Sequence, residues 1–155
     1  LLSRFECRYL LIAAMFHDFD HTGRAENDDI NIALAVRGLR RHCADEDRSH
    51  LDWICGMIEA TEFPHKGDSR GMPIEIQILR DTDVSQALSV AWIQQCVFGF
   101  AREWGTTPLE VLAKQGPFLR SLRFTSTWAT QERFPQEEID AKIEEARELL
   151  EILEG

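Results

Sequence analysis

Apolar residues recur every three or four positions along most of this chain, a spacing that places them on one face of an α-helix. The first such run extends from Phe5 to Phe16 through Tyr9, Ile12 and Ala13. No stretch alternates Val, Ile or Thr with polar residues for long enough to make a sheet. The pattern therefore predicts an all-α fold built from several helices.

The same pattern returns after each polar or Gly/Pro-containing segment. Further helices are expected at residues 30–41, 51–62, 74–88, 88–104, 109–122 and 135–153. Residues 63–73 are expected to form a loop, and residues 124–134 have no clear period. Gly116-Pro117 is expected to break the helix that contains it. The predicted organisation is a helical core over residues 1–134, with residues 135–155 forming an amphipathic acidic helix packed on that core.

Several of these helices have expected core positions. They are Phe5 in the first helix, Ile30, Ala33, Leu34 and Leu39 in the second, the four-spaced Leu88, Trp92, Cys96, Phe100 and Trp104, and Ile139, Ile143, Leu150 and Leu153 in the last.

The first helical run, which includes the apolar stretch Leu10–Phe16, leads directly into His17-Asp18-Phe19-Asp20-His21-Thr22-Gly23. Ionisable side chains next to a buried helix are costly unless they are hydrogen-bonded, paired or bound to metal. If the helix continues through the motif, His17 and His21 share a face because they are four residues apart. Imidazole and carboxylate groups together suit a divalent ion such as zinc, manganese, iron or magnesium.

This motif resembles the signature of the HD superfamily of metal-dependent phosphohydrolases. It is most similar to the cyclic-nucleotide phosphodiesterase branch, in which Thr22 is usually proline. The resemblance implies a compact multi-helix HD-domain bundle in which His17 and Asp18 bind metal. It also implies that Asp20 and His21 act just outside the ligands, where they orient groups or stabilise the phosphate.

A second segment resembles the same family. Asp81-Thr-Asp83-Val84-Ser85 is similar to the Ala-Asp-Leu-Ser stretch of the phosphodiesterases, in which the aspartate closes the metal site. On that match Asp83 is the third ligand and Asp81 is not a ligand. One or two ions held this way would polarise a phosphoryl oxygen and activate a bound water.

Residues near the expected site depart from the family pattern. Glu62 stands where the phosphodiesterases have an aspartate, and His65 follows in a Pro/Gly-containing loop. Asp28 and Asp29 stand where the family has histidines. These four residues are candidates for lining the cavity, and the two aspartates could build a second site of oxygen ligands suited to magnesium or manganese.

The chain begins with Leu1-Leu2-Ser3, inside a helical pattern and without methionine. We therefore expect it to be truncated at its N-terminus. In the family, an upstream segment would supply a further metal-binding histidine and the proposed general-acid histidine.

Net charge restricts the partners that the protein can bind, and cysteine content indicates its compartment. A formal net charge of −10 argues against nucleic acid polymers and anionic membranes as partners. No apolar stretch has the length of a membrane span. The four cysteines lack metal-binding spacing and are expected to be reduced core residues of a cytoplasmic protein.

The leading hypothesis is thus a metal-dependent phosphohydrolase, specifically a phosphodiesterase acting on a small nucleotide-like ester. A nucleotidase of the same superfamily is the second enzyme hypothesis. A non-catalytic HD-type domain that senses a ligand or mediates signalling contacts is the alternative from another class, and an oligomer is compatible with each.

Overall fold

The computed structural model describes residues 2–23, 28–65 and 71–155 of the 155-residue chain. Every regular element within those ranges is helical and none is a strand, which confirms the predicted all-α fold. Over the same ranges no helix is long and apolar enough to cross a membrane. Contacts divide the chain into two compact units, Leu1–Arg80 and Asp81–Gly155, and the division falls inside helix α4 (Ile74–Ser85).

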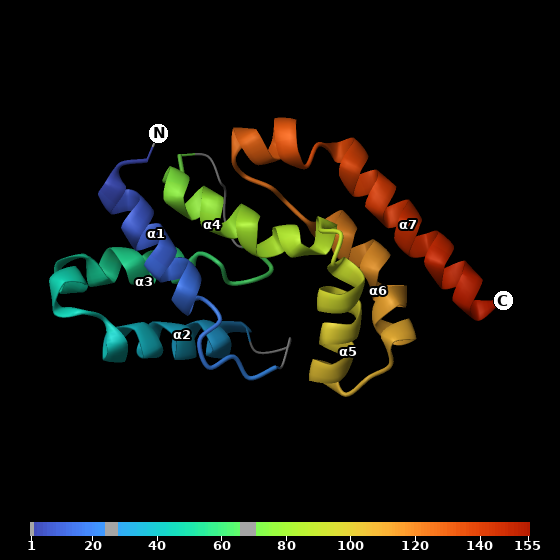
Figure 1. Cartoon of the computed structure of the whole chain (residues 1–155), viewed down its shortest axis with the longest axis horizontal. Coiled ribbons are helices and arrows are strands. Elements are labelled where there is room, and N and C mark those ends of the chain that lie inside the picture. Colours follow the sequence, from blue (N-terminus) through green and yellow to red (C-terminus); the bar gives the residue numbers. More distant parts are fainter. Residues whose placement is uncertain (1, 24–27, 66–70) are drawn as a thin grey trace. The chain divides into compact units, whose positions relative to one another are not determined.

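The first unit is built around three helices that contact one another: α1 (Arg4–Phe16), α2 (Asp28–His42) and α3 (Leu51–Glu59). Figure 1 shows α1 crossing α3, and α1 contacts both α2 and α3. The first turn of α1 is fixed by a capping box, in which the Ser3 hydroxyl accepts from the Glu6 backbone and the Glu6 carboxylate accepts from the Ser3 backbone. The core of this unit consists of Tyr9, Ala13, Ala35, Leu39, Ile54, Cys55, Met57, Ile58 and Leu79.

A partly buried ion pair ties α1 to the 3₁₀-helix Asp45–His50 that precedes α3. Arg8 donates from Nε and Nη2 to the two carboxylate oxygens of Asp47, at 2.8 and 2.9 Å. The Asp47 side chain is almost fully buried, whereas that of Arg8 is 46% exposed. This pairing satisfies a carboxylate that would otherwise be expensive to bury.

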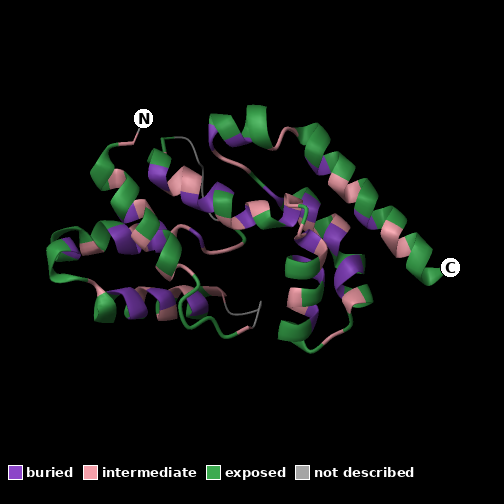
Figure 2. Ribbon diagram, viewed as in Figure 1, coloured by how far each residue is buried: buried purple, intermediate pink, exposed green. Residues whose placement is uncertain are grey.

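The second unit contains the end of α4, a 3₁₀-helix (Gln86–Leu88), two π-helices (Ile93–Phe98 and Ala129–Arg133), and helices α5 (Gly99–Trp104), α6 (Pro108–Ser121) and α7 (Gln136–Glu154). Helix α7 packs along α6, and Figure 2 shows that its buried positions form a narrow stripe on an otherwise exposed helix. Trp92 joins α7 through an Nε1 hydrogen bond to Glu145, 3.3 Å long, and the Lys142 ammonium lies 5.2 Å from its ring centre.

Several expected core positions are wrong. Phe5 is 69% exposed, Ile30 is 45% exposed, and Ala33 is also exposed. The buried face of α2 instead carries Asn31, Ala35, Gly38 and Leu39. This face differs from the apolar stripe because a polar residue and a glycine, which hydropathy does not select, occupy two of its positions. Leu153, expected on the buried face of α7, is 59% exposed near the end of that helix.

Two expectations about helix continuity are also wrong. Helix α6 runs through Gly116-Pro117, because the buried side chains on both sides of Pro117 hold the helix although one backbone donor is missing. The stretch 88–104 is interrupted after Leu88, and its middle forms a π-helix. A four-residue repeat drifts by about 40° per step around an α-helix, and the wider π turn keeps Trp92 and Cys96 buried.

The contact boundary lies at residues 80/81. Because α7 packs on α6, residues 135–155 belong to the same unit as the helices before them. The sequence gives no sign of the 80/81 boundary, since it lies within one continuous helix and has no Pro- or Gly-rich linker.

Candidate metal centre

Helix α1 ends where the motif begins. Phe16 is its last residue, and the backbone N–H of the capping residue His17 donates to the Ala13 carbonyl at 2.9 Å. Residues 17–20 form a turn, and Asp20 adopts a left-handed backbone conformation with φ of 61°. The expectation that His17 and His21 share one helix face is therefore wrong, because the helix stops before His21.

The ring orientation of His17 is set by its own helix. Its Nδ1 lies 2.7 Å from the carbonyl oxygen of Ala14. A carbonyl only accepts, so Nδ1 carries the proton and, in the neutral ring, the lone pair is on Nε2. A histidine whose far nitrogen donates to a backbone carbonyl is a common arrangement for metal ligands.

The lone-pair nitrogen of His17 faces a carboxylate. Its Nε2 lies 3.3 Å from Oδ2 of Asp18. Two atoms that bear lone pairs repel one another at this distance unless a proton or a metal ion lies between them. Two ligands bonded at about 2.1 Å to one ion are separated by about 3.0–3.4 Å, so the observed spacing fits a shared ion.

Asp18 is more exposed than the sequence indicated. Its side chain is 70% exposed, and that of His17 is 22% exposed. The premise that Asp18 emerges into the buried core is wrong, because the last turns of α1 also expose Ala14 and Met15. Exposure leaves the carboxylate accessible to water. Asp20 is exposed as well.

His21 is held from α2. Its Nε2 lies 2.9 Å from Nδ2 of the buried Asn31, and its Nδ1 lies 3.0 Å from the Gly23 backbone nitrogen. Oδ1 of Asn31 accepts from the backbone N–H of Thr22 at 3.0 Å and from its hydroxyl at 2.8 Å. A proline at residue 22 could not make the first of these bonds, because it has no backbone N–H.

Sequence reasoning missed Asn31. The available signal was a polar residue between Ile30 and Ile32 inside a predicted helix, where asparagine has a poor propensity and needs a specific partner.

Among the residues proposed to line the site, Asp28 is tied to the segment that contains Glu62 and His65. Its Oδ2 accepts from the backbone N–H of Phe63. His65 packs its ring edge-on against the ring of Phe63, with 5.5 Å between their centres. Glu62 and His65 are half-buried, whereas Asp29 is exposed on the first turn of α2.

Asp81 and Asp83 lie on the last turns of α4, in the second unit. Asp81 is buried, and its carboxylate accepts from the backbone N–H groups of Thr125 and Ser126 at 2.7 and 2.8 Å and from the Thr125 hydroxyl at 3.0 Å. It therefore anchors the segment after α6. Asp83 is half-buried.

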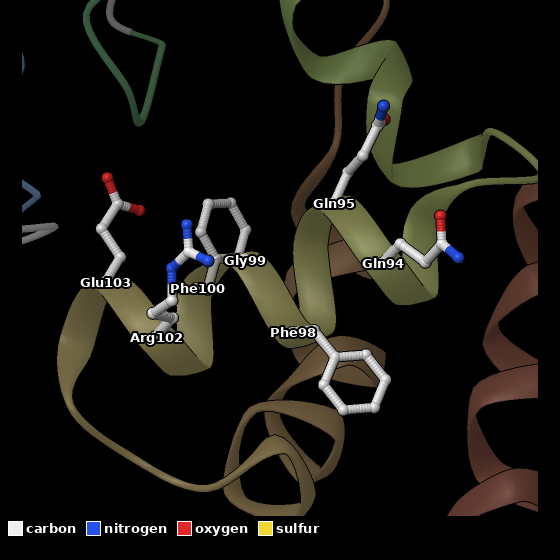
Figure 3. A pocket seen from close by; sticks show the side chains of 7 residues that line it. All are labelled: Gln94, Gln95, Phe98, Gly99, Phe100, Arg102 and Glu103. Atoms are coloured by element: carbon white, nitrogen blue, oxygen red, sulfur yellow. The ribbon is translucent and has the colours of Figure 1, made fainter.

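The second unit also has an open hollow of about 550 Å³, lined by Gln94, Gln95, Phe98, Gly99, Phe100, Arg102 and Glu103. Figure 3 shows the two glutamines extending from the π-helix and Arg102 and Glu103 from α5. None of the predicted site residues lines this hollow.

Comparison with known proteins returned no match among family models, curated proteins or solved structures.

Proposed function

We propose that this chain is a metal-dependent phosphohydrolase, specifically a phosphodiesterase that hydrolyses a small nucleotide-like phosphate ester. The observation that carries the proposal is the 3.3 Å approach of the lone-pair nitrogen of His17 to the Asp18 carboxylate. That pair attracts a cation and lies in the motif that resembles the HD superfamily. A nucleotidase of that superfamily would use the same pair.

His17 and Asp18 would hold a divalent ion, with Asp83 as the third ligand. A mixed nitrogen and oxygen set suits manganese, magnesium, zinc or iron, as one ion or two. When bound there, the metal supplies a water of lowered pKa and polarises a phosphoryl oxygen.

Asp83 is included because Asp83-Val84-Ser85 resembles the segment whose aspartate closes the metal site in the phosphodiesterases.

The remaining candidates would act around the ligands. The exposed Asp20 carboxylate would accept a proton or orient water, while His21 would hold the motif turn in place. Glu62 and His65, with Asp28 tied to their segment, would line the substrate side, and Asp29 would add negative charge at a second cation position.

We further propose that the protein works in the cytoplasm on a small substrate and not on a nucleic acid polymer or a membrane. The net charge of −10 disfavours polyanionic partners, and all four cysteines are in the thiol form.

The experiment that tests the proposal is metal content after incubation with excess Mn²⁺ and desalting, measured by elemental mass spectrometry. Wild type, His17→Ala and Asp83→Ala would be compared with Asp140→Ala, which removes an exposed carboxylate from α7. We expect wild type and Asp140→Ala to retain metal, and both ligand variants to bind it about tenfold or more weakly.

Activity would then be measured on bis(p-nitrophenyl) phosphate and on cyclic nucleotides with Mn²⁺ or Mg²⁺. Hydrolysis lost in His17→Ala and Asp83→Ala supports the enzyme. Equal metal in all four proteins would overturn the ligand assignment. Stoichiometric metal with no hydrolysis of any ester would favour the ligand-sensing domain.

A further inference from the structure

Asn31 connects the motif turn to α2 by using both ends of its side-chain amide. Its oxygen accepts two bonds from Thr22, and its nitrogen lies against Nε2 of His21. The side chain is 3% exposed, so neither end can exchange its protein partner for water at low cost.

The backbone of Thr22 determines which way the amide of Asn31 points. The Thr22 N–H is a donor that cannot reverse its role, so the atom facing it must be the amide oxygen. The amide nitrogen therefore faces His21 and donates to it. Consequently Nε2 of His21 must accept, and the proton of the neutral ring is placed on Nδ1.

The hydrogen bond from Gly23 opposes this assignment. The Gly23 N–H donates to Nδ1 of His21 at 3.0 Å, which requires a lone pair on Nδ1, but this hydrogen bond is exposed, whereas the Asn31 contact is partly buried. Water can satisfy the Gly23 donor, while an unsatisfied donor at Asn31 would cost about 1–3 kcal/mol. The buried contact therefore decides the tautomer.

We propose that Asn31 is a positioning residue that holds His21 as the Nδ1–H tautomer and fastens the metal-binding turn to α2. With Nε2 occupied by Asn31, His21 orients the turn and does not donate a proton from Nε2 to a leaving group. The catalytic consequence rests on the proposed phosphohydrolase function, whereas the tautomer itself does not.

The test is the protonation of each ring nitrogen of His21, read from long-range ¹H–¹⁵N NMR spectra at about pH 8, where an ordinary imidazole is neutral. The signals would be assigned with His21→Gln. We expect Nδ1 of wild type to be protonated and Nε2 to be unprotonated. Protonated Nε2 in wild type would overturn the proposal.

Asn31→Asp is the informative variant because it keeps the shape of the side chain but replaces the donor with an acceptor. The carboxylate would still accept from Thr22 and would now accept from His21 as well, so we expect the proton to move to Nε2. An unchanged tautomer would contradict the role of Asn31.

Thr22→Val is the matched control. It removes the hydroxyl bond to Asn31 but keeps the backbone N–H that orients the amide, so the tautomer should be unchanged. Thr22→Pro removes that N–H and should let both tautomers populate. This variant keeps the proposal testable if Asn31→Asp does not fold.

Hydrolysis and Mn²⁺ affinity separate a positioning role from failure of the proposed function. We expect Asn31→Asp to lower kcat about tenfold or more and to leave Mn²⁺ affinity within about threefold. Loss of Mn²⁺ affinity equal to that in His17→Ala would overturn the positioning role. If wild type binds no metal, the phosphohydrolase fails while the tautomer assignment is still judged by NMR.

Discussion

The ring of Phe19 occupies the space that a side chain at Gly38 would need. A Cβ atom built on Gly38 would lie 2.3 Å from Cδ1 and 2.7 Å from Cε1 of that ring. Phe19 also contacts the rings of Phe16 and His42, with centres 5.5 and 5.8 Å away. The residue between Asp18 and Asp20 is therefore packed against α2 at its one buried glycine.

Gly38→Ala is expected to displace Phe19 and with it the turn that carries Asp18. Because the nearest atoms belong to a large ring held by other rings, we expect a loss of about 1–3 kcal/mol in the free energy of unfolding, measured by urea denaturation. If His17 and Asp18 hold Mn²⁺ as proposed, Mn²⁺ affinity should fall as well, since these two residues directly precede the displaced ring.

Gly56→Ala is the matched control for this prediction. Gly56 lies in α3, and a Cβ there would meet no atom within 4 Å. This substitution should be neutral or stabilise by up to about 1 kcal/mol. Equal stability of Gly38→Ala and Gly56→Ala would contradict the packing of Phe19 described above.

The Arg8–Asp47 pair predicts a specific loss of stability in acid. The hydrogen bonds from Arg8 hold the pKa of the Asp47 carboxyl below its ordinary value in the folded protein. A lowered folded pKa contributes stability that is complete above the unfolded pKa of about 3.9 and is lost as the pH falls through the folded pKa.

Asp47→Asn should therefore lower the free energy of unfolding at neutral pH by about 1–2 kcal/mol and flatten its dependence on pH below about pH 4. The measurement is urea denaturation at a series of pH values. Asp52→Asn is the control, because Asp52 is 91% exposed and its ion pair with Arg40 is on the surface. A pH dependence identical to wild type in Asp47→Asn would rule out this role for the pair.

In the second unit, the hydrogen bonds of Asp81 predict a loss of stability when its carboxylate is replaced. Its buried carboxylate accepts two backbone N–H groups and a hydroxyl from Thr125 and Ser126. Asp81→Asn turns one accepting oxygen into a donor that faces other donors, so we expect a loss of about 2–4 kcal/mol in thermal or urea unfolding. Glu148→Gln, an exposed change on α7, should stay within about 0.5 kcal/mol of wild type. A similarly small effect of Asp81→Asn would show that these bonds contribute little.

Sequence patterns were sufficient to locate the helices whose burial is decided by local periodicity. The position of α3 and the start of α7 after Pro135 follow from spacing and from the residues that begin or end helices. The pattern failed where distant contacts decide burial. Phe5 has helical spacing but extends away from the core, and Gly38 is buried because it accommodates Phe19.

In the candidate site, too, the sequence predicted some features, and others depend on contacts that the sequence does not reveal. The motif predicted that His17 and Asp18 lie together, and their side chains approach to 3.3 Å between Nε2 and Oδ2. The tautomer of His17 depends on the carbonyl of Ala14, and the contacts of His21 depend on Asn31, ten residues later. The sequence could predict neither, because the first depends on the side-chain rotamer of His17 and the second on the path of the chain after α1.

Thiol reactivity tests the burial of the four cysteines, which the sequence placed together in the core. Cys55 and Cys96 are buried, and burial raises the pKa of both thiols, whereas Cys7 is exposed on α1. Because the thiolate is the reactive form, a disulfide reagent at about pH 7.5 should modify Cys7 first and should reach Cys55 and Cys96 only when the protein unfolds. Cys43, half-buried and with a pKa also raised by burial, should react at an intermediate rate. Cys7→Ser should abolish the fast phase seen by absorbance, while Cys55→Ser should leave it intact. A fast phase that survives in Cys7→Ser would place another thiol at the surface and contradict this order.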